Sequence, residues 1–211
     1  MNIDKEARCR ILSTALRLFS RQGYNKTTIR QLAKEASVNI ASVNYYFKDK
    51  LGLYNACFDA HSSEILAMTT RLEKSPESLQ EIYETLKHVI EDAHQLYINN
   101  PNLVLLIFSE LKTKIRPDSF LKKSHVFKLF FQLEIYLKQA IEKNILSSSI
   151  DSHIIASAFC GSLFQSIIFD ENHQQEFGHC IKNNIEYRES FSHQLAYVYT
   201  YGMLHRGDEN V

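Results

Sequence analysis

Apolar residues recur along most of this chain at the spacing of one helix face, and this pattern predicts an all-α protein. Between residues 29 and 36 they stand at positions i, i+3, i+4 and i+7, which is the period of an amphipathic helix. Longer segments repeat the period, and nowhere does the alternation of a strand appear between hairpin turns. These segments, with the residues that start and stop them, predict about nine helices.

The first three predicted helices are short and close together, over residues 4–22, 29–36 and 40–47. Thr28 stands three residues before Gln31, as in a capping box, where the two side chains each satisfy an orphan backbone amide at a helix start. A tight turn separates the second helix from the third, which presents small polar and aromatic side chains. That arrangement is typical of a helix-turn-helix, whose second helix enters the major groove of DNA.

Six longer helices are expected in the rest of the chain. Ser75-Pro76 and Asn100-Pro101 are start signals, because Pro fits the first position of a helix, and Arg116-Pro117 interrupts the pattern again. Residues 170–186 are polar and are expected to form a loop with at most one irregular helix. The six segments are residues 48–73, 76–99, 101–114, 120–144, 152–169 and 187–204.

Charge is distributed unevenly along the 211 residues, although the chain as a whole has a formal net charge of zero. Residues 1–50 contain 10 Lys and Arg and 4 Asp and Glu, a net charge of +6, whereas residues 51–211 contain 14 and 20, a net charge of −6. A basic first quarter suits contact with phosphates at that end of the chain. A solvated, charged helix face is the alternative explanation.

The four cysteines are widely spaced and form no Cys-x-x-Cys pair. Each lies in or beside an apolar helical pattern, which favours buried, reduced thiols in a reducing compartment. A redox-sensing thiol is the alternative. The cysteines are Cys9, Cys57, Cys160 and Cys180.

No segment of the sequence indicates a membrane or a secretory signal. The N-terminus is charged and lacks the apolar core of a signal peptide. The longest uninterrupted apolar run, residues 103–108, is far too short to span a bilayer. We therefore expect a soluble, cytoplasmic protein without a membrane partner.

The segment from Arg8 to Leu53 resembles the N-terminal DNA-binding domain of the TetR family of transcriptional regulators. The form NIASVNYYF is most similar to a subgroup with an Asn-Ile-Ala turn, and Ser37, Ile40 and Asn44 depart from the commonest pattern. The resemblance rests on Ile11-Leu12, Ala15, Leu18-Phe19, Gly23-Tyr24, Thr27-Thr28-Ile29, Leu32-Ala33, Ala36, Val38, Tyr46-Phe47 and Lys50-Leu53.

The resemblance implies two domains: a three-helix helix-turn-helix domain over residues 1–50, and a larger helical effector-binding and dimerisation domain over residues 51–211. It also implies which residues contact DNA. Thr28, Tyr45, Tyr46 and Lys50 match positions that contact phosphates, and Asn39, Ile40, Ala41, Ser42 and Asn44 match positions that lie against base edges.

Side-chain chemistry suggests a role for several of these residues. Asn44 could bridge N6 and N7 of adenine, while Ile40 and Ala41 could touch thymine methyl groups. Each of two residues has an alternative, purely structural role. Tyr46 could pack beneath the motif, and Asn39 could serve only to cap the third helix.

The resemblance further implies an effector pocket in the helical body and a homodimer formed by the last two long helices. Aromatic side chains with a few polar tips are typical of a ligand pocket, and the same residues could equally form plain core. The pocket candidates are Phe58, His61, Tyr97, Phe108, Phe127 and Phe164. The dimer candidates are Ala158, Gly161, Ser162, Phe191, Leu195, Val198 and Gly202.

The main alternative from another class is a helical metal-binding protein. Two Glu-x-x-His pairs, Glu91…His94 and Glu176…His179, resemble the ligands of a di-iron bundle, but two supporting glutamates are not evident. The chain has no Gly-rich phosphate loop and no Gly-x-Ser-x-Gly elbow, so we expect no catalytic residues, no metal and no cofactor. The sequence thus favours a repressor that binds a palindromic double-stranded DNA operator and is released by a small, largely apolar molecule. A regulator controlled by a protein partner or by Cys oxidation is the alternative within DNA binding.

Overall fold

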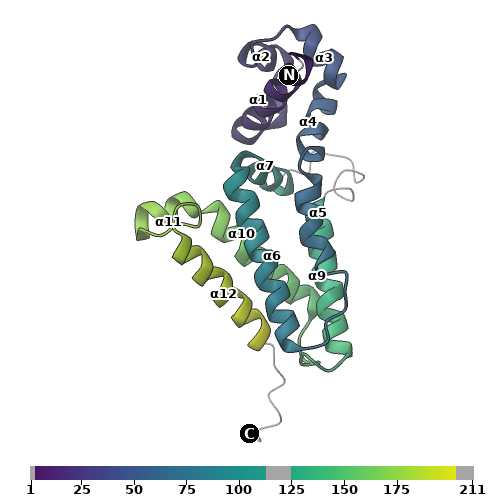
Figure 1. Ribbon diagram of the computed structural model, residues 1–211, viewed down its shortest axis with the longest axis vertical. Helices are drawn as coiled ribbons and strands as arrows, with labels where there is room; N and C mark the ends of the chain where they lie inside the picture. The colour runs from purple at the N-terminus through teal and green to yellow at the C-terminus, as the bar shows by residue number, and fades with distance from the viewer. Residues whose placement is uncertain (1–2, 113–124, 203–211) are drawn as a thin grey trace, which may run out of the picture. The chain divides into compact units, whose positions relative to one another are not determined.

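The computed structural model describes residues 3–112 and 125–202, and within those residues the chain forms helices joined by loops, with no strand (Figure 1). The all-α prediction is confirmed. Eleven helices are present in the described residues, against about nine expected. Their packing divides the chain into two compact units, Met1–Ser63 with Asn100–Arg116 and Glu64–Asn99 with Pro117–Val211.

The first unit is arranged around its longest helix, α1. Four helices pack with it: α1 contacts α2, α3, α4 and α7, and α3 also contacts α2 and α4. This unit is larger than a helix-turn-helix domain of residues 1–50, because α4 and α7 belong to it. The helices are α1 (Ile3–Lys26), α2 (Ile29–Glu35), α3 (Ile40–Phe47), α4 (Lys50–Asp59) and α7 (Pro101–Lys112).

Three aromatic rings join α1 to α4 inside the first unit. The ring centroids of Phe19 and Tyr54 lie 5.0 Å apart, as do those of Tyr24 and Tyr54, and both pairs meet edge to face. Phe19 and Tyr54 are completely buried. Burial of side chains of this size contributes about 1.5–3 kcal/mol each, so this cluster fixes the start of α4 against α1.

Two glycines permit the tight turns of the first unit. Gly23 has a φ of 80° and interrupts α1 where the sequence predicted a stop; this region of φ favours glycine. Gly52 lies in the first turn of α4, where a Cβ atom would come within 2.0 Å of the backbone oxygen of Phe47. Because that oxygen belongs to the end of α3, only glycine allows α3 and α4 to approach so closely.

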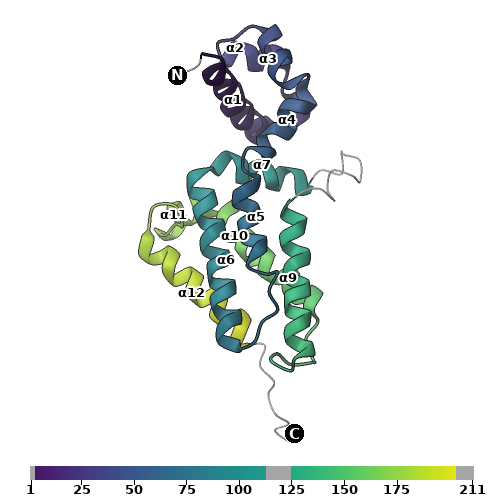
Figure 2. The same ribbon diagram turned by 45° about the vertical axis from the view of Figure 1, so that its right-hand side comes forward.

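The second unit is a bundle around α6 (Figure 2). Tyr83, near the start of α6, lies beside Tyr201 at the end of α12, and His94 lies beside Phe191. These two helices are therefore antiparallel. The helices of this unit are α6 (Leu79–Asn99), α9 (His125–Glu142), α10 (Ser152–Ile168), α11 (Asp170–Phe177) and α12 (Ile185–Tyr201). Helix α5 (Ser62–Thr70) also belongs to it from Glu64 onward.

The helix expected over residues 48–73 is two helices, α4 and α5. After Asp59 the chain tightens into a turn in which the backbone amide of His61 donates to the carbonyl of Phe58 at 3.1 Å. The apolar period continues through this turn, so the sequence pattern did not reveal it. The polar segment after residue 169 contains the regular helix α11, which ends at Gly178 in the left-handed conformation.

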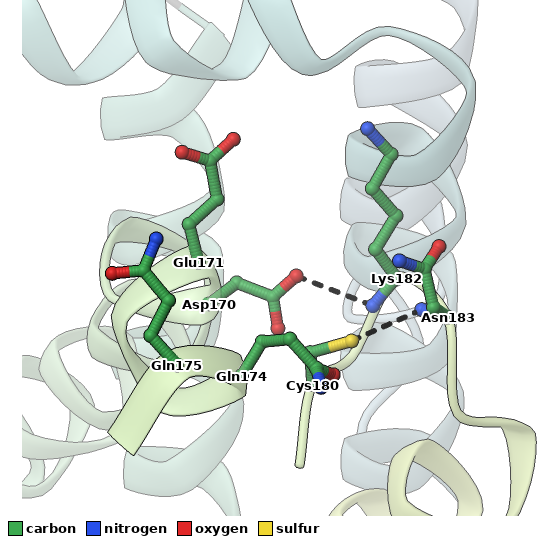
Figure 3. A pocket seen from close by; sticks show the side chains of 7 residues that line it. All are labelled: Asp170, Glu171, Gln174, Gln175, Cys180, Lys182 and Asn183. Carbon is green, nitrogen blue, oxygen red and sulfur yellow. Dashed lines mark hydrogen bonds between the residues drawn. The ribbon is translucent and has the colours of Figure 1, made fainter. Parts of the chain in front are cut away.

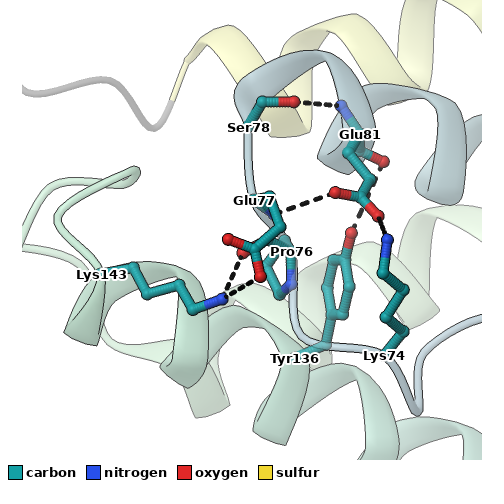
Figure 4. Close-up of polar contacts among 7 residues, drawn as sticks. All are labelled: Lys74, Pro76, Glu77, Ser78, Glu81, Tyr136 and Lys143. Carbon is teal, nitrogen blue, oxygen red and sulfur yellow. Dashed lines mark hydrogen bonds and ion pairs between the residues drawn. The ribbon is translucent and has the colours of Figure 1, made fainter.

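Helix α6 begins later than Ser75-Pro76 suggested. Ser78 is the capping residue, since its hydroxyl accepts a hydrogen bond from the backbone amide of Glu81 at 3.1 Å. Residues 75–77 remain non-helical. The ammonium group of Lys143, which directly follows α9, donates to the carbonyl of Pro76 at 3.0 Å and to Glu77 at 2.7 Å, and these bonds hold the segment in place (Figure 4).

The expected interruption at Arg116-Pro117 and the first residues of the helix expected from residue 120 lie outside the described residues. Within the described residues, no single helix is long and apolar enough to cross a membrane. Helices α10 and α11, which are bent by 64° relative to each other, are together long and apolar enough, by length and composition alone.

Candidate nucleic-acid interface

Helix α3 is started by a side-chain cap. The amide oxygen of Asn39 accepts hydrogen bonds from the backbone amide of Ser42 at 2.7 Å and from its hydroxyl at 2.9 Å. Asn39 therefore satisfies one of the orphan amides at the helix start. Two residues that the sequence placed against base edges are bonded to each other at this end of α3.

The inner face of α3 is fully packed. Val43 is completely buried and Phe47 is 6% exposed, while the guanidinium of Arg8 lies 5.2 Å from the centroid of the Phe47 ring. Because these side chains hold one side of the short helix against the rest of the unit, the opposite side faces solvent.

The outer face of α3 consists of residues at positions i, i+1, i+4 and i+5, which share one side of a helix. Ile40 is 45% exposed and Tyr45 is 77% exposed, and Ala41 and Asn44 are exposed between them. Three expected base-contacting residues and one expected phosphate-contacting residue thus form one continuous surface, with an amide and apolar groups available to a groove.

Tyr46 differs from its neighbour Tyr45 in exposure. Its ring is half-buried and meets the Tyr45 ring edge to face at 5.1 Å and the Phe47 ring at 6.3 Å. The ring of Tyr46 is thus partly enclosed, whereas that of Tyr45 projects from the outer face, and either a DNA contact or a packing role remains open to Tyr46.

Thr28 and its neighbour Thr27 fix the start of α2. The hydroxyl of Thr28 accepts a hydrogen bond from the backbone amide of Gln31 at 3.1 Å. The buried hydroxyl of Thr27 donates to the carbonyl of Gly23 at 2.9 Å and accepts from the side chain of Gln22 at 3.1 Å. This network fixes the turn between α1 and α2.

An ion pair joins the same two helices. Arg17 donates to the carboxylate of Glu35 at 2.7 Å. The hydrogen bond from Arg17, helped by one from Gln31, lowers the pKa of Glu35. Since Glu35 is exposed, water screens the pair, and we expect its contribution to stability to be small.

Lys50 occupies a position that the sequence assigned to a phosphate contact. Its ammonium group donates to the backbone carbonyls of Tyr24 and Thr27, each at 3.0 Å, and lies 4.2 Å from the centroid of the Tyr24 ring. Lys50 thus ties the first residue of α4 to the α1–α2 turn. The sequence pattern did not indicate this role, because residues 24 and 50 approach each other only in the folded unit.

Exposed cations that make no ion pair with any described residue lie on and beside the helix-turn-helix. Arg10 and Arg17 pair with Glu6 and Glu35. By contrast, none of the described residues forms an ion pair with Lys26, Arg30, Lys34 or Lys48. The sequence analysis did not single out these four residues as DNA contacts, although the excess positive charge of residues 1–50 indicated a basic group there.

The residues proposed for an effector pocket belong to both units. Phe58, His61 and Phe108 are in the first, Tyr97 and Phe164 are in the second, and the side chain of Phe127 lies outside the described residues. Tyr97 is 4% exposed, and its pKa is raised by burial and by the nearby carboxylate of Asp170, to which it is hydrogen-bonded.

The interior of the second unit contains an apolar void among α6, α9, α10 and α12. It is too narrow to admit a water molecule. None of the six proposed pocket residues lines it. The lining residues are Leu86, Leu133, Leu137, Ile155, Phe159 and Tyr199.

His94 is a buried polar residue in the same unit. Its Nε2 lies 3.1 Å from the hydroxyl of Ser166, and its Nδ1 has no hydrogen-bond partner among the described residues. Burial, together with the positive charge of Arg188, lowers the pKa of His94 to about 3. The neighbouring Glu91 instead pairs with Lys87 at 2.7 Å, so this Glu-x-x-His pair does not converge.

The other alternative functions receive no structural support from the described residues. No group of three or more His, Cys, Asp or Glu side chains there is arranged to hold a metal ion. Burial raises the pKa of the thiols of Cys57 and Cys160 to about 12, which opposes thiolate formation, and Cys180 is buried as well. Cys9, on α1, is exposed.

The proposed dimer residues are divided between buried and open positions. On α10, Ala158 and Gly161 are exposed, whereas the hydroxyl of Ser162 turns toward α12 of the same chain and lies 3.0 Å from that of Tyr199. A Cβ atom at Gly161 would meet nothing within 4 Å.

On α12, Val198 is 59% exposed and Gly202 is exposed, while Phe191 and Leu195 are half-buried. Ile154, one turn before Ala158 on α10, is 62% exposed. The open face of α10 thus consists of small and apolar residues at positions i, i+4 and i+7.

A short helix with a packed inner face, a side-chain cap and an exposed polar and aromatic outer face, braced by a preceding helix, defines a helix-turn-helix DNA-binding protein. Residues 11–57 match the family model described as bacterial regulatory proteins, tetR family. Over these residues the chain therefore resembles the DNA-binding domain of the TetR family of transcriptional regulators.

Two curated relatives and one solved structure illustrate the similarity. The chain is 28% identical over 129 residues to the transcriptional regulator YttP of Bacillus subtilis, covering 58% of this chain and 62% of YttP. It is 33% identical over 93 residues to the biofilm operon negative transcriptional regulator IcaR of Staphylococcus aureus, covering 42% and 48%. The chain thus spans about half to three fifths of the length of these relatives.

The fold extends over nearly the whole chain. The transcriptional regulator FadR from Bacillus subtilis, in a structure with stearoyl-CoA, matches with a TM-score of 0.67 at 17% sequence identity, covering 92% of this chain and 98% of that one. At this identity the match establishes the architecture of both units.

Proposed function

We propose that the protein is a homodimeric repressor that binds a palindromic operator through α3 and leaves it when a small, largely apolar ligand occupies the helical body. Residues 1–50 form its DNA-binding domain, and residues 51–211 form its effector-binding and dimerisation domain. The exposed outer face of α3, backed by a fully packed inner face, is the observation that carries the proposal. As a DNA-binding regulator, the protein works in the cytoplasm.

The outer face supplies two kinds of contact. Asn44 presents an amide that can donate to and accept from adenine, and Ile40 and Ala41 present carbon atoms to thymine methyl groups. Tyr45 and Lys48 project at the same end of the helix, where their polar tips can reach phosphate oxygens. Phosphate contacts place the helix in the groove, and the base contacts select the sequence.

Asn39 and Ser42 act on DNA mainly by positioning α3. The amide oxygen of Asn39 already accepts two hydrogen bonds from Ser42. Only the side-chain NH₂ group of Asn39 is therefore available to donate to DNA. Thr28 likewise caps α2, which leaves its hydroxyl proton for a phosphate oxygen. Lys50 acts by holding α4 against the α1–α2 turn.

Repression and a second subunit are supported by the relatives and by the open face of the second unit. IcaR is named as a negative regulator of its operon. In this chain Gly161, Ala158 and Val198 leave a surface of small and apolar side chains on α10 and α12, which a second copy would cover. Two recognition helices in one dimer would contact half-sites about 34–36 Å apart, and the operator would then be palindromic.

The apolar class of the effector follows from the interior of the second unit. The void among α6, α9, α10 and α12 holds no guest as it stands, but its lining is entirely apolar apart from the Tyr199 hydroxyl. Such a lining suits an apolar group, because a polar one would lose its hydrogen bonds to water there. FadR, a structural neighbour, was solved with stearoyl-CoA. Enlargement of the void by an acyl chain or a similar apolar group would have to separate these helices.

Selection of bound sequences from a random duplex pool, repeated at two salt concentrations, tests the DNA-binding proposal. We expect a palindromic consensus whose affinity decreases steeply with salt. Stearoyl-CoA and simpler apolar compounds are then titrated against the bound complex, with release as the expected result. Binding without any sequence preference would refute operator recognition, and a consensus complex that no apolar compound weakens would refute the effector class alone.

A further inference from the structure

A polar cavity of about 220 Å³ lies in the second unit between α11 and the loop that leads to α12 (Figure 3). It shares no residue with the apolar void of the core, and none of its residues was a candidate in the sequence. Its lining consists of Asp170, Glu171, Gln174, Gln175, Cys180, Lys182 and Asn183.

The floor of this cavity is fixed by a buried carboxylate. Asp170 is 2% exposed, and it accepts hydrogen bonds from the backbone amides of Ile181 and Lys182, the latter at 3.2 Å. Its carboxylate also receives the hydroxyl of Tyr97. The buried sulfur of Cys180 accepts a hydrogen bond from the amide of Asn183 at 3.3 Å. The loop is therefore held in shape before any ligand binds, which reduces the entropy lost on binding.

The two walls carry charges of opposite sign. Glu171 stands on α11 at positions i, i+3 and i+4 with Gln174 and Gln175, so these three share one face. Lys182 and Asn183 come from the loop, and Figure 3 shows the Lys182 ammonium and the Glu171 carboxylate on opposite sides of the cavity. Within the described part of the chain, neither Glu171 nor Lys182 forms an ion pair.

We propose that this cavity binds a small zwitterion of the amino-acid type, with its ammonium group at Glu171 and its carboxylate at Lys182. The carboxamides of Gln174, Gln175 and Asn183 can both donate and accept, and they satisfy further polar atoms of the ligand. The volume of about 220 Å³ lies below the roughly 300–1,000 Å³ of pockets for drug-sized ligands, so the ligand is smaller than such molecules.

Other ligand classes fit the cavity less well. An apolar guest would remove water from two charged and three amide side chains without replacing their hydrogen bonds. A simple cation or anion would match one wall and leave the opposite charge facing it. A zwitterion matches both, and hydrogen bonds to charged groups are among the strongest in proteins.

The test measures binding directly, on the full chain without DNA. Proteinogenic L-amino acids are screened by thermal unfolding, and each one that raises the Tm is titrated by calorimetry beside its N-acetyl and carboxamide derivatives, which each lack one of the two charges. We expect at least one amino acid to bind, and both derivatives to bind about tenfold or more weakly, because one charge-assisted contact is lost.

Glu171→Gln and Lys182→Met test the two walls separately. Both side chains are exposed, so the variants should fold, which circular dichroism verifies. Each variant should lower the affinity for the same amino acid by a similar factor. The matched controls Glu186→Gln and Lys138→Met, at exposed positions outside the cavity, should leave that affinity unchanged. The proposal is overturned if no amino acid binds, if the derivatives bind equally well, or if both wall variants keep the parent affinity. Any of these results would leave the operator-binding proposal intact, since no DNA is present.

Discussion

The ammonium group of Lys50 contacts Tyr24 twice, by a 3.0 Å hydrogen bond to its carbonyl and at 4.2 Å from the centroid of its ring. The same group also donates a hydrogen bond to the carbonyl of Thr27, in the α1–α2 turn, at 3.0 Å. A lysine at the start of α4 thus stabilises the α1–α2 turn, on which the helix-turn-helix depends.

Lys50→Met should therefore destabilise the free protein. Loss of charge-assisted hydrogen bonds to two carbonyls costs about 1–3 kcal/mol, which urea unfolding followed by circular dichroism would detect. Lys48→Met is the matched control, because Lys48 is exposed and its replacement should change stability by less than about 0.5 kcal/mol. Equal stability of the two variants would mean that the Lys50 contacts are energetically negligible.

Asn44→Ala should relax sequence preference without abolishing binding. A bidentate contact to adenine discriminates by about 1–3 kcal/mol, so the variant should bind the selected operator and its single-base variants with more similar affinities. The measurement is fluorescence anisotropy on matched duplexes. Unchanged discrimination at every operator position would show that the outer face of α3 does not use this amide.

Lys48→Met should instead weaken all duplexes alike. A lost phosphate contact lowers affinity independently of sequence and reduces the slope of log affinity against log salt by about 1. Lys138→Met, a change to an exposed cation of α9 in the second unit, should leave that slope unaltered. A slope that responds equally to both changes would argue against a local phosphate contact at Lys48.

The helix-turn-helix could be predicted from the sequence because its determinants are local. Thr28 and Asn39 cap the helices that they precede, and both caps are visible as short-range patterns. The inward positions of Val43 and Phe47 follow from the helical period alone. By contrast, the contacts of Lys50 join residues 24 and 50, and only packing brings them together.

The chain after the helix-turn-helix was less predictable for two physical reasons. The apolar period runs unbroken from α4 into α5, so the turn at Ala60 and His61 left no mark in the pattern. Helix α11 is polar on most sides, and its buried residue, Asp170, is a carboxylate that bonds to the backbone of a later loop. No hydrophobic pattern could reveal that arrangement.

His94 should make the stability of the second unit depend on pH. Its pKa lies near 3 in the folded chain, below the value of about 6.5 in an unfolded chain. The unfolded state therefore binds more protons between these values, and stability falls as the pH drops below about 6.5. At about pH 5 the loss from this residue should be roughly 2 kcal/mol relative to pH 8.

His94→Gln removes that titration while keeping a group that can bond to Ser166. The variant should be less stable than the parent at pH 8, since the core is disturbed, but its stability should decrease by roughly 2 kcal/mol less on acidification to about pH 5. Urea unfolding at both pH values measures this difference. Parallel pH profiles for the two proteins would show that His94 does not carry the effect.

Gly161→Glu should prevent association of two copies without unfolding the chain. A Cβ atom at this position meets nothing within 4 Å, so the carboxylate can point into solvent in the single chain, but it would be buried without a partner if α10 faced a second copy. Burying an unpaired charge costs several kcal/mol, enough to shift a dimer to monomers. Analytical ultracentrifugation gives the mass, and circular dichroism verifies the helix content.

Gly161→Ala provides the control for this change. Alanine should raise helix stability by up to about 1 kcal/mol, and its single methyl group should be far less disruptive to association than a charge. A dimeric Gly161→Ala variant beside a monomeric, folded Gly161→Glu variant would place the interface on α10. If the Gly161→Glu variant also remained dimeric, the second copy would have to pack elsewhere. A close helix contact at residue 161 would bury the new carboxylate without a partner, which costs several kcal/mol.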